Sequence, residues 1–219
     1  MKRGAVLLLL FLVSLYSYAQ STVGLKEVIV KPNTEKVLIG TKQRKADYGI
    51  GGSKDFPFFQ TAYFIPSNGV TGFVDRVGLY IYHKHSFLEF AKPAKELLLY
   101  LYLPDSAGMP GALFVPEPIH IKPKKNTYWH WVDLSEYSLN LPAQGVFAAV
   151  GWVKPSKNDA GPLVGMSNEC SDCPFYIYRF MTEDSAWHKI DTNKVPVTDK
   201  KNAFRNGLMV RLEVAVEAK

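Results

Sequence analysis

Apolar and polar residues alternate along three stretches of this chain. Every second residue is Val, Leu or Ile in residues 77–81, in residues 97–103 and in residues 208–216. Successive side chains of a β-strand point to opposite faces, so this alternation is typical of a strand with one face on a core. We therefore predict a strand at each of the three stretches.

Shorter stretches rich in β-branched and aromatic residues lie between clusters of turn-forming residues. Helical periodicity is nearly absent, and Gly, Pro, Asp and Ser gather in the turns, as at residues 49–52 and 104–111. Several short strands separated by turns are typical of a sandwich. We expect an all-β domain, a two-sheet antiparallel sandwich of the jelly-roll kind. The shorter predicted strands are residues 28–30, 62–65, 129–134, 146–153 and 175–181.

The N-terminal residues have the three parts of a secretory signal peptide. Lys2 and Arg3 form a positive start, and Ala5–Val13 is an unbroken apolar run. That run is shorter than the roughly 20 residues that a membrane-spanning helix needs. Ser17–Ala19 supplies the small residues of a cleavage site, so we expect cleavage before Gln20.

This leader predicts an exported protein. We expect a signal peptide at residues 1–19, an extended lead-in segment at residues 20–45 and a β-sandwich domain at residues 46–219. No second apolar stretch is long enough to span a bilayer, so no transmembrane segment is expected after cleavage. The expected location is the periplasm, the outer-membrane surface or the space outside the cell.

The charge pattern argues against a nucleic-acid partner. The formal net charge of the chain is +6. The leader carries two positive residues, so the expected mature chain has 24 Lys and Arg against 20 Asp and Glu, a net charge of +4. These positive residues are scattered in loop-like clusters, whereas a nucleic-acid footprint is a continuous basic stripe.

Five short segments carry a family resemblance. Leu25–Pro32 (LKEVIVKP) resembles the segment that follows carboxypeptidase-regulatory-like domains in exported proteins of Gram-negative bacteria. The other four resemble a family of uncharacterised exported β-sandwich proteins in which that segment leads into a jelly-roll domain. The resemblance covers residues 25–155 and implies a fold and a compartment but no activity. No regulatory-like domain is expected here, because the leader ends just before Leu25. The four segments are Leu99–Asp105, Met109–Leu113, Trp131–Tyr137 and Leu141–Phe147.

Cys170 and Cys173 are the only cysteines, and they form a CxxC pair. A structural zinc site usually needs two such pairs, and a redox pair needs a helix N-terminus. Here Pro174 and a strand-like stretch follow. In an exported protein we predict a disulfide that closes a turn, with redox exchange and metal binding as alternatives.

His83 and His85 lie two residues apart at the end of a predicted strand and would face the same side. Two such histidines are a candidate metal platform, but the pair also occurs often in surface loops, and we predict no metal ion or cofactor. No GxSxG or HExxH motif occurs. We therefore expect no enzyme, and a hydrolase with dispersed carboxylates is the third hypothesis.

Aromatic residues give the main functional hypothesis. Several lie on the non-core positions of predicted strands that are candidate neighbours, where an exposed aromatic face would bind a partner. We predict an exported non-enzymatic binding module that contacts another cell-envelope protein. The alternative is a carbohydrate-binding module that uses exposed Tyr and Trp to hold a glycan. The candidate ligand-binding residues are Tyr80, Tyr82, Tyr100, Tyr102, Trp129 and Trp131.

Overall fold

The computed structural model of this chain is built almost entirely of strands. The described residues include one helical element, the short 3₁₀ turn η1 (Ser135–Tyr137). None of these residues belongs to a helix that is long and apolar enough to cross a membrane. The prediction of an all-β domain is confirmed. The structure describes residues 34–51, 59–83, 96–124, 127–152, 162–167, 175–180, 186–191 and 207–218.

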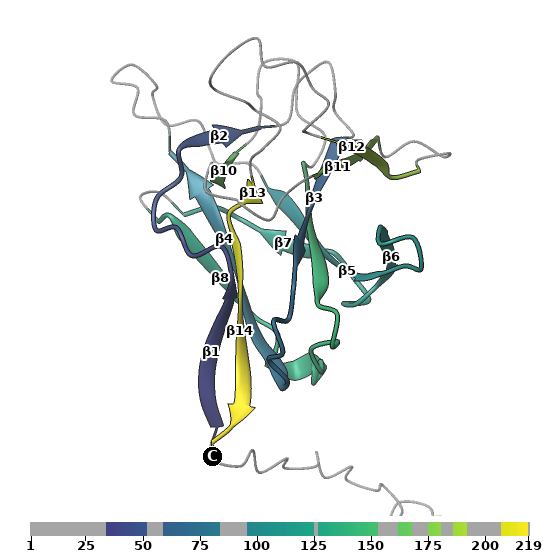
Figure 1. The fold of residues 1–219 in the computed structure, drawn as a ribbon. Helices are drawn as coiled ribbons and strands as arrows, with labels where there is room; N and C mark the ends of the chain where they lie inside the picture. The colour runs from purple at the N-terminus through teal and green to yellow at the C-terminus, as the bar shows by residue number, and fades with distance from the viewer. Residues whose placement is uncertain are drawn as a thin grey trace, which may run out of the picture. The chain divides into compact units, whose positions relative to one another are not determined.

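The strands form two antiparallel sheets that pack face to face (Figure 1). The first sheet has the order β1 (Thr34–Gly40), β14 (Val210–Glu217), β4 (Phe73–Tyr82), β10 (Leu163–Ser167) and β13 (Gly207–Leu208), with β2 (Tyr48–Ile50) beside β10 and β8 (Trp129–Asp133) beside β4. The second sheet has the order β12 (His188–Asp191), β11 (Phe175–Phe180), β3 (Phe59–Ile65), β9 (Val146–Trp152), β5 (Leu97–Pro104) and β6 (Pro110–Leu113), with β7 (Ile119–Ile121) beside β5.

The strand pairs are nested along the chain. β5 pairs with β6 and β7, β4 with β8, β3 with β9, and β1 with β14. The chain is therefore one long hairpin folded across the two sheets, which is the connectivity of a jelly roll. The strands from β10 to β13 are inserted between β9 and β14 and extend both sheets.

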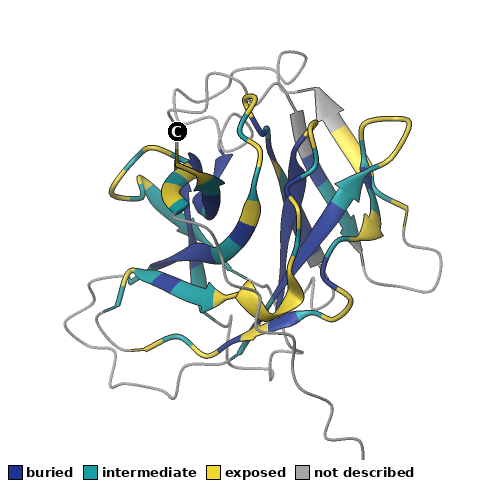
Figure 2. Cartoon of the chain, turned by 90° about the horizontal axis from the view of Figure 1, so that it is seen from below, coloured by how far each residue is buried: buried dark blue, intermediate teal, exposed yellow. Residues whose placement is uncertain are grey.

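The core lies between the two sheets and includes the apolar residues that the alternating pattern predicted to be buried. Burying this continuous apolar layer is the main favourable contribution to folding. Figure 2 shows buried residues on the strands of both sheets and exposed residues mainly in the turns. The fully buried aliphatic residues of β4, β5, β9 and β14 include Leu79, Leu97, Leu99, Leu101, Val146, Val150, Val210, Leu212 and Val214.

The expected lead-in contributes the first strand. All seven residues of β1 are in register with β14 (Figure 1), and Ile39 is buried opposite Leu212. Residues 34–40 therefore belong to the first sheet. The leader and the predicted strand at residues 28–30 lie outside the described residues.

Candidate functional site

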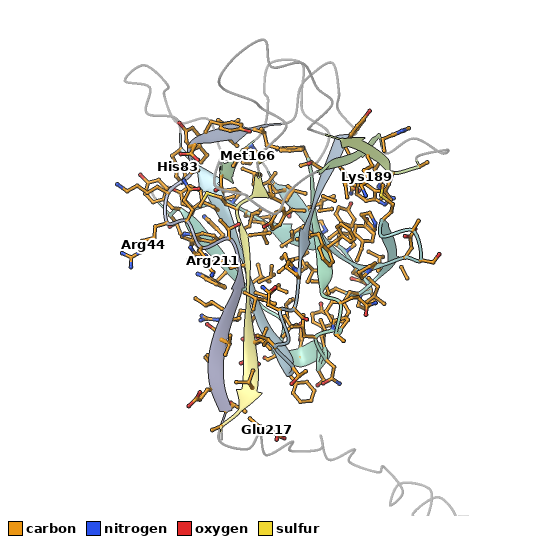
Figure 3. The ribbon with its side chains drawn as sticks, in the orientation of Figure 1. Arg44, His83, Met166, Lys189, Arg211 and Glu217 are labelled. Atoms are coloured by element: carbon orange, nitrogen blue, oxygen red, sulfur yellow. The ribbon has the colours of Figure 1, made fainter. Side chains whose placement is uncertain are left out.

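The candidate tyrosines lie on two separate faces. β4 is in the first sheet and β5 in the second, so the expectation that these strands are neighbours is wrong. Tyr80 and Tyr82 belong to the outer face of the first sheet, and Tyr100 and Tyr102 to that of the second. The cause is the nested hairpin, in which consecutive strands cross between the sheets. Figure 3 labels Arg211 on β14 and Lys189 on β12, which lie on opposite sides of the view.

Three of the four tyrosines are buried, although an exposed aromatic face was expected. The exposed fraction is 5% for Tyr80, 8% for Tyr100 and 4% for Tyr102. Each ring lies under or beside other large side chains on its outer face. Tyr82 is half-buried. The prediction of exposed rings is therefore wrong for these three residues.

Trp129 and Trp131 form the centre of an aromatic–arginine strip on the first sheet. Their rings are stacked with centroids 6.1 Å apart. The Arg76 guanidinium carbon lies 5.2 Å from the Trp131 ring centroid, and that of Arg211 lies 4.1 Å from the Trp129 centroid. A guanidinium over an indole face is attracted by the negative charge of the ring face. We define the strip as these four residues and Tyr80, whose ring meets Trp129 edge-on at 5.4 Å.

Glycines let the rings of the strip lie flat on the sheet. Trp131 lies opposite Gly78 in the register, and a Cβ atom on Gly78 would be 2.8 Å from Trp131 Cε3. A Cβ atom on Gly165 would likewise be 2.5 Å from Tyr80 Cδ1. Real Cβ atoms do not come this close to a ring, so only glycine accommodates these contacts. The Trp131 ring therefore lies against the sheet at Gly78, and the Arg76 guanidinium lies over the ring.

Hydrogen bonds fix the arginines of the strip. Glu213 accepts hydrogen bonds from Arg76 Nε at 3.1 Å and from Lys36 Nζ at 2.7 Å, and it also pairs with Arg76 Nη2. The hydrogen bonds from Arg76 hold the pKa of Glu213 below its ordinary value. Arg211 Nε donates to the Thr41 carbonyl at 2.6 Å. Both arginines are thus oriented before any partner binds.

A second cluster lies on the outer face of the second sheet. It consists of Gln60, Tyr100, Tyr102, Arg179 and Trp187, and we call it the Gln60 cluster. Arg179 Nε donates to Gln60 Oε1 at 2.7 Å, and Arg179 Nη2 donates to the Tyr102 hydroxyl at 2.7 Å. The Arg179 guanidinium carbon lies 4.5 Å from the Trp187 ring centroid and 5.5 Å from that of Tyr102. The two tyrosine rings are stacked 6.0 Å apart.

Burial sets the electrostatics of the Gln60 cluster. Desolvation raises the pKa of Tyr100 and of Tyr102, and the positive charge of Arg179 and hydrogen bonding by the Gln60 side chain partly oppose the shift. The two hydroxyls therefore stay protonated at neutral pH. Gln60 is fully buried, and its side chain is satisfied within the cluster by Arg179 and the two tyrosine hydroxyls.

The other candidates are the histidine pair and the cysteine pair. His83 Nε2 lies 3.0 Å from the Thr127 carbonyl oxygen, so a backbone group occupies that nitrogen. No group of three metal-ligating side chains occurs in the described part of the chain. His85, Cys170 and Cys173 all lie outside the described residues. The disulfide stays a prediction, and nothing here tests the histidine pair as a candidate metal platform.

The charged members of both clusters were absent from the candidate list. Arg76 is four residues before Tyr80, so the alternating pattern predicts both side chains on the same face of the strand. Arg211 lies between core residues of β14, so the same pattern predicts it on the outer face. Gln60 and Arg179 give no such signal. They meet only because β3 and β11 pair with these two residues directly opposite each other.

Comparison with known proteins leaves the functional argument to these two clusters. The resemblance to exported β-sandwich proteins stays a prediction, because nothing in the comparison bears on it. No family model, no curated protein and no solved structure matches this chain.

Proposed function

We propose that this protein is an exported, non-enzymatic binding module that contacts another cell-envelope protein through the aromatic–arginine strip. The observation that carries the proposal is the half-buried Trp129–Trp131 stack with an arginine on each ring. Trp and Arg are the residues most enriched among those that dominate the binding energy of protein interfaces. The leader at residues 1–19 supports export.

Preorganisation supports a binding role for the strip. The Trp131 ring contacts Gly78 and Arg76, and Arg76 is held by Glu213. Side chains that are already ordered lose little conformational entropy when a partner binds. Exposed Leu38 lies opposite Glu213 in the register and extends this face with an apolar side chain. Such a mixture of apolar and arginine surface suits a protein partner.

The strip favours a protein over a glycan. A sugar ring that stacks on tryptophan needs an open ring face, but a guanidinium lies over each of the Trp129 and Trp131 rings. The strip gives no support to a hydrolase either. A carboxylic acid that donates a proton at neutral pH needs a raised pKa, whereas the pKa of Glu213 is lowered.

Site-specific photo-cross-linking in the producing cell tests the proposal. A photoreactive amino acid replaces Leu38, which is 54% exposed beside the strip, or Leu113, a control that is 42% exposed on the second sheet. We expect one protein adduct of defined mass in the envelope fraction from position 38 only. The double variant with Trp131→Leu should lose this adduct. Equal labelling at both positions, or no adduct at position 38, contradicts the proposal.

A further inference from the structure

The strand β1 has a hydrogen-bonded neighbour on one side only. It pairs with β14 along all seven of its residues, and no other described strand pairs with it (Figure 1). Thr41 N donates to the Val210 carbonyl at 3.0 Å. Because successive residues of a strand direct their backbone groups to opposite sides, the N–H and C=O groups of residues 34, 36, 38 and 40 point to the free edge.

The free edge of β1 lacks three features that commonly keep sheet edges apart, which are a proline, a β-bulge and a lysine directed outward. β1 contains no proline and pairs with β14 without a register shift. Its one lysine, Lys36, bonds to Glu213 at 2.7 Å and lies 3.8 Å from Asp75. These carboxylates belong to β14 and β4, so the ammonium lies over the sheet and not beyond its edge.

The sequence of β1 is complementary to a second copy of itself in one antiparallel register. A two-fold axis at Val37 places Val37 opposite its counterpart, and Lys36 opposite Leu38 of the other copy. All seven residues then overlap, the backbone groups at the two free edges pair, and no charge lies opposite a like charge. A shift by two residues in either direction shortens the overlap, and a shift by one exchanges the faces of the sheet.

This pairing would cover apolar side chains on both faces of the strand. Leu38 is 54% exposed on the outer face, and Val37 is half-buried against the core. The aliphatic stem of Lys36 from the other copy would lie beside Leu38, and the two Val37 side chains would extend the apolar layer. Removing this apolar surface from water favours the pairing.

We propose that β1 joins two copies of this chain across a two-fold axis, so that their first sheets form one continuous sheet. Pairing about such an axis closes the assembly at two copies. The outer faces of the two first sheets then point the same way, which places two aromatic–arginine strips on one surface. The contact does not depend on what the strip binds. One strand pair is small for a protein interface, so the dimer should dissociate on dilution.

Analytical ultracentrifugation of the purified protein from about 1 μM to about 1 mM tests the dimer. We expect the mass to rise with concentration from one chain to two. Leu38→Pro removes an N–H that points to the free edge, so it should prevent the dimer and keep the circular dichroism spectrum. Leu113→Pro is the matched control and should dimerise like the unchanged protein. Leu113 is exposed on the edge strand β6, and Phe114 N bonds to the Leu101 carbonyl, so the Leu113 N–H also points outward.

A cysteine at the axis tests the register. Val37→Cys places two thiols opposite each other, with Cα atoms about 5 Å apart, which a disulfide bridges. Mild oxidation should give a linked dimer on a non-reducing gel, and adding Leu38→Pro should remove it. Two copies of Glu35→Cys would be separated by about 13 Å along the strands and should not link. The unchanged protein, which has Cys170 and Cys173, gives the background.

A single-chain mass at every concentration, or a dimer that folded Leu38→Pro leaves intact, would overturn the proposal. Absence of a link from Val37→Cys, or equal linking from Glu35→Cys, would overturn it as well, and this arm decides the question if Leu38→Pro does not fold. A link between two copies forms in the purified protein alone and has the mass of two chains. It is therefore distinguished from an adduct with another envelope protein at position 38.

Discussion

Replacing Glu213 with Gln removes the charge that orients Arg76 while keeping the shape of the side chain. The Glu213 carboxylate accepts two hydrogen bonds from Arg76 and one from Lys36. Gln keeps one acceptor oxygen and introduces an NH₂ group that faces the guanidinium. We expect Glu213→Gln to destabilise the first sheet and to loosen Arg76 over Trp131.

The magnitude follows from the exposure of the two partners. The Glu213 side chain is 8% exposed and that of Arg76 is 41% exposed. Bonds to charged groups contribute about 1.5–3 kcal/mol when buried, and surface ion pairs contribute about 0–1 kcal/mol. Because water can rehydrate Arg76, we expect a loss of about 1.5 kcal/mol. In a domain of this size that lowers Tm by about 3–6 °C. Lys36 is excluded from this figure because solvent screens its ammonium.

The effect should depend on pH with a defined sign. The pKa of Glu213 is below its ordinary value in the folded state, so the unfolded chain binds this proton more readily. The contribution of the charge is complete above about pH 5 and is lost as the pH falls through the lowered pKa. Urea unfolding at pH 7, 5 and 3 should therefore show the wild-type and Glu213→Gln free energies converging at low pH.

Glu217→Gln is the control for this experiment, since it removes an exposed carboxylate from the same strand. It should change the free energy of unfolding by less than about 0.5 kcal/mol at each pH. A Glu213→Gln deficit that is equal at pH 7 and pH 3 would refute the reasoning. The loss would then come from packing or desolvation and not from the charge.

Three further predictions concern the core, the strip and the cysteines. Leu101→Ala leaves a cavity in the fully buried layer and should cost about 3–4 kcal/mol in urea unfolding, whereas equal stability would contradict the core assignment. Gly78→Ala should displace the Trp131 ring and cost about 1–2 kcal/mol, and an unchanged indole NMR signal for Trp131 would contradict the contact. A thiol count on the oxidised, purified protein should find no free thiol at Cys170 and Cys173, so two free thiols would rule out the predicted disulfide.

The strand positions could be predicted where aliphatic residues on one face of a strand pack on the core between the sheets. Residues 77–81 and 97–103 alternate because one side of each strand lies on the core, and the buried positions were assigned correctly. β1 was missed as a strand because Glu35 and Lys36 interrupt its apolar pattern. Its conformation depends on pairing with β14, a contact between the two ends of the domain that no local pattern contains.

The two functional clusters could be predicted only in part, because they also depend on contacts between distant residues. The alternating pattern predicted that Tyr80 and Tyr100 point away from the core. It does not predict which sheet a strand belongs to or which residues cover its outer face. Arg179 covers Tyr102 from a strand 77 positions further along the chain. Such non-local contacts decide whether an aromatic residue is exposed, and they follow from the topology and not from the local sequence.

The pairing of the first strand with the last also constrains the order in which this domain can form. Among the described strands β14 is synthesised last, and β1 has no other hydrogen-bonded neighbour among them. The pairing of β1 therefore cannot form until β14 has been synthesised. A chain that cannot close early stays unfolded for longer and depends on contacts between distant residues, which form slowly. For the export that we propose, a delay in pairing β1 with β14 would be an advantage, because an exported chain crosses the membrane before it folds.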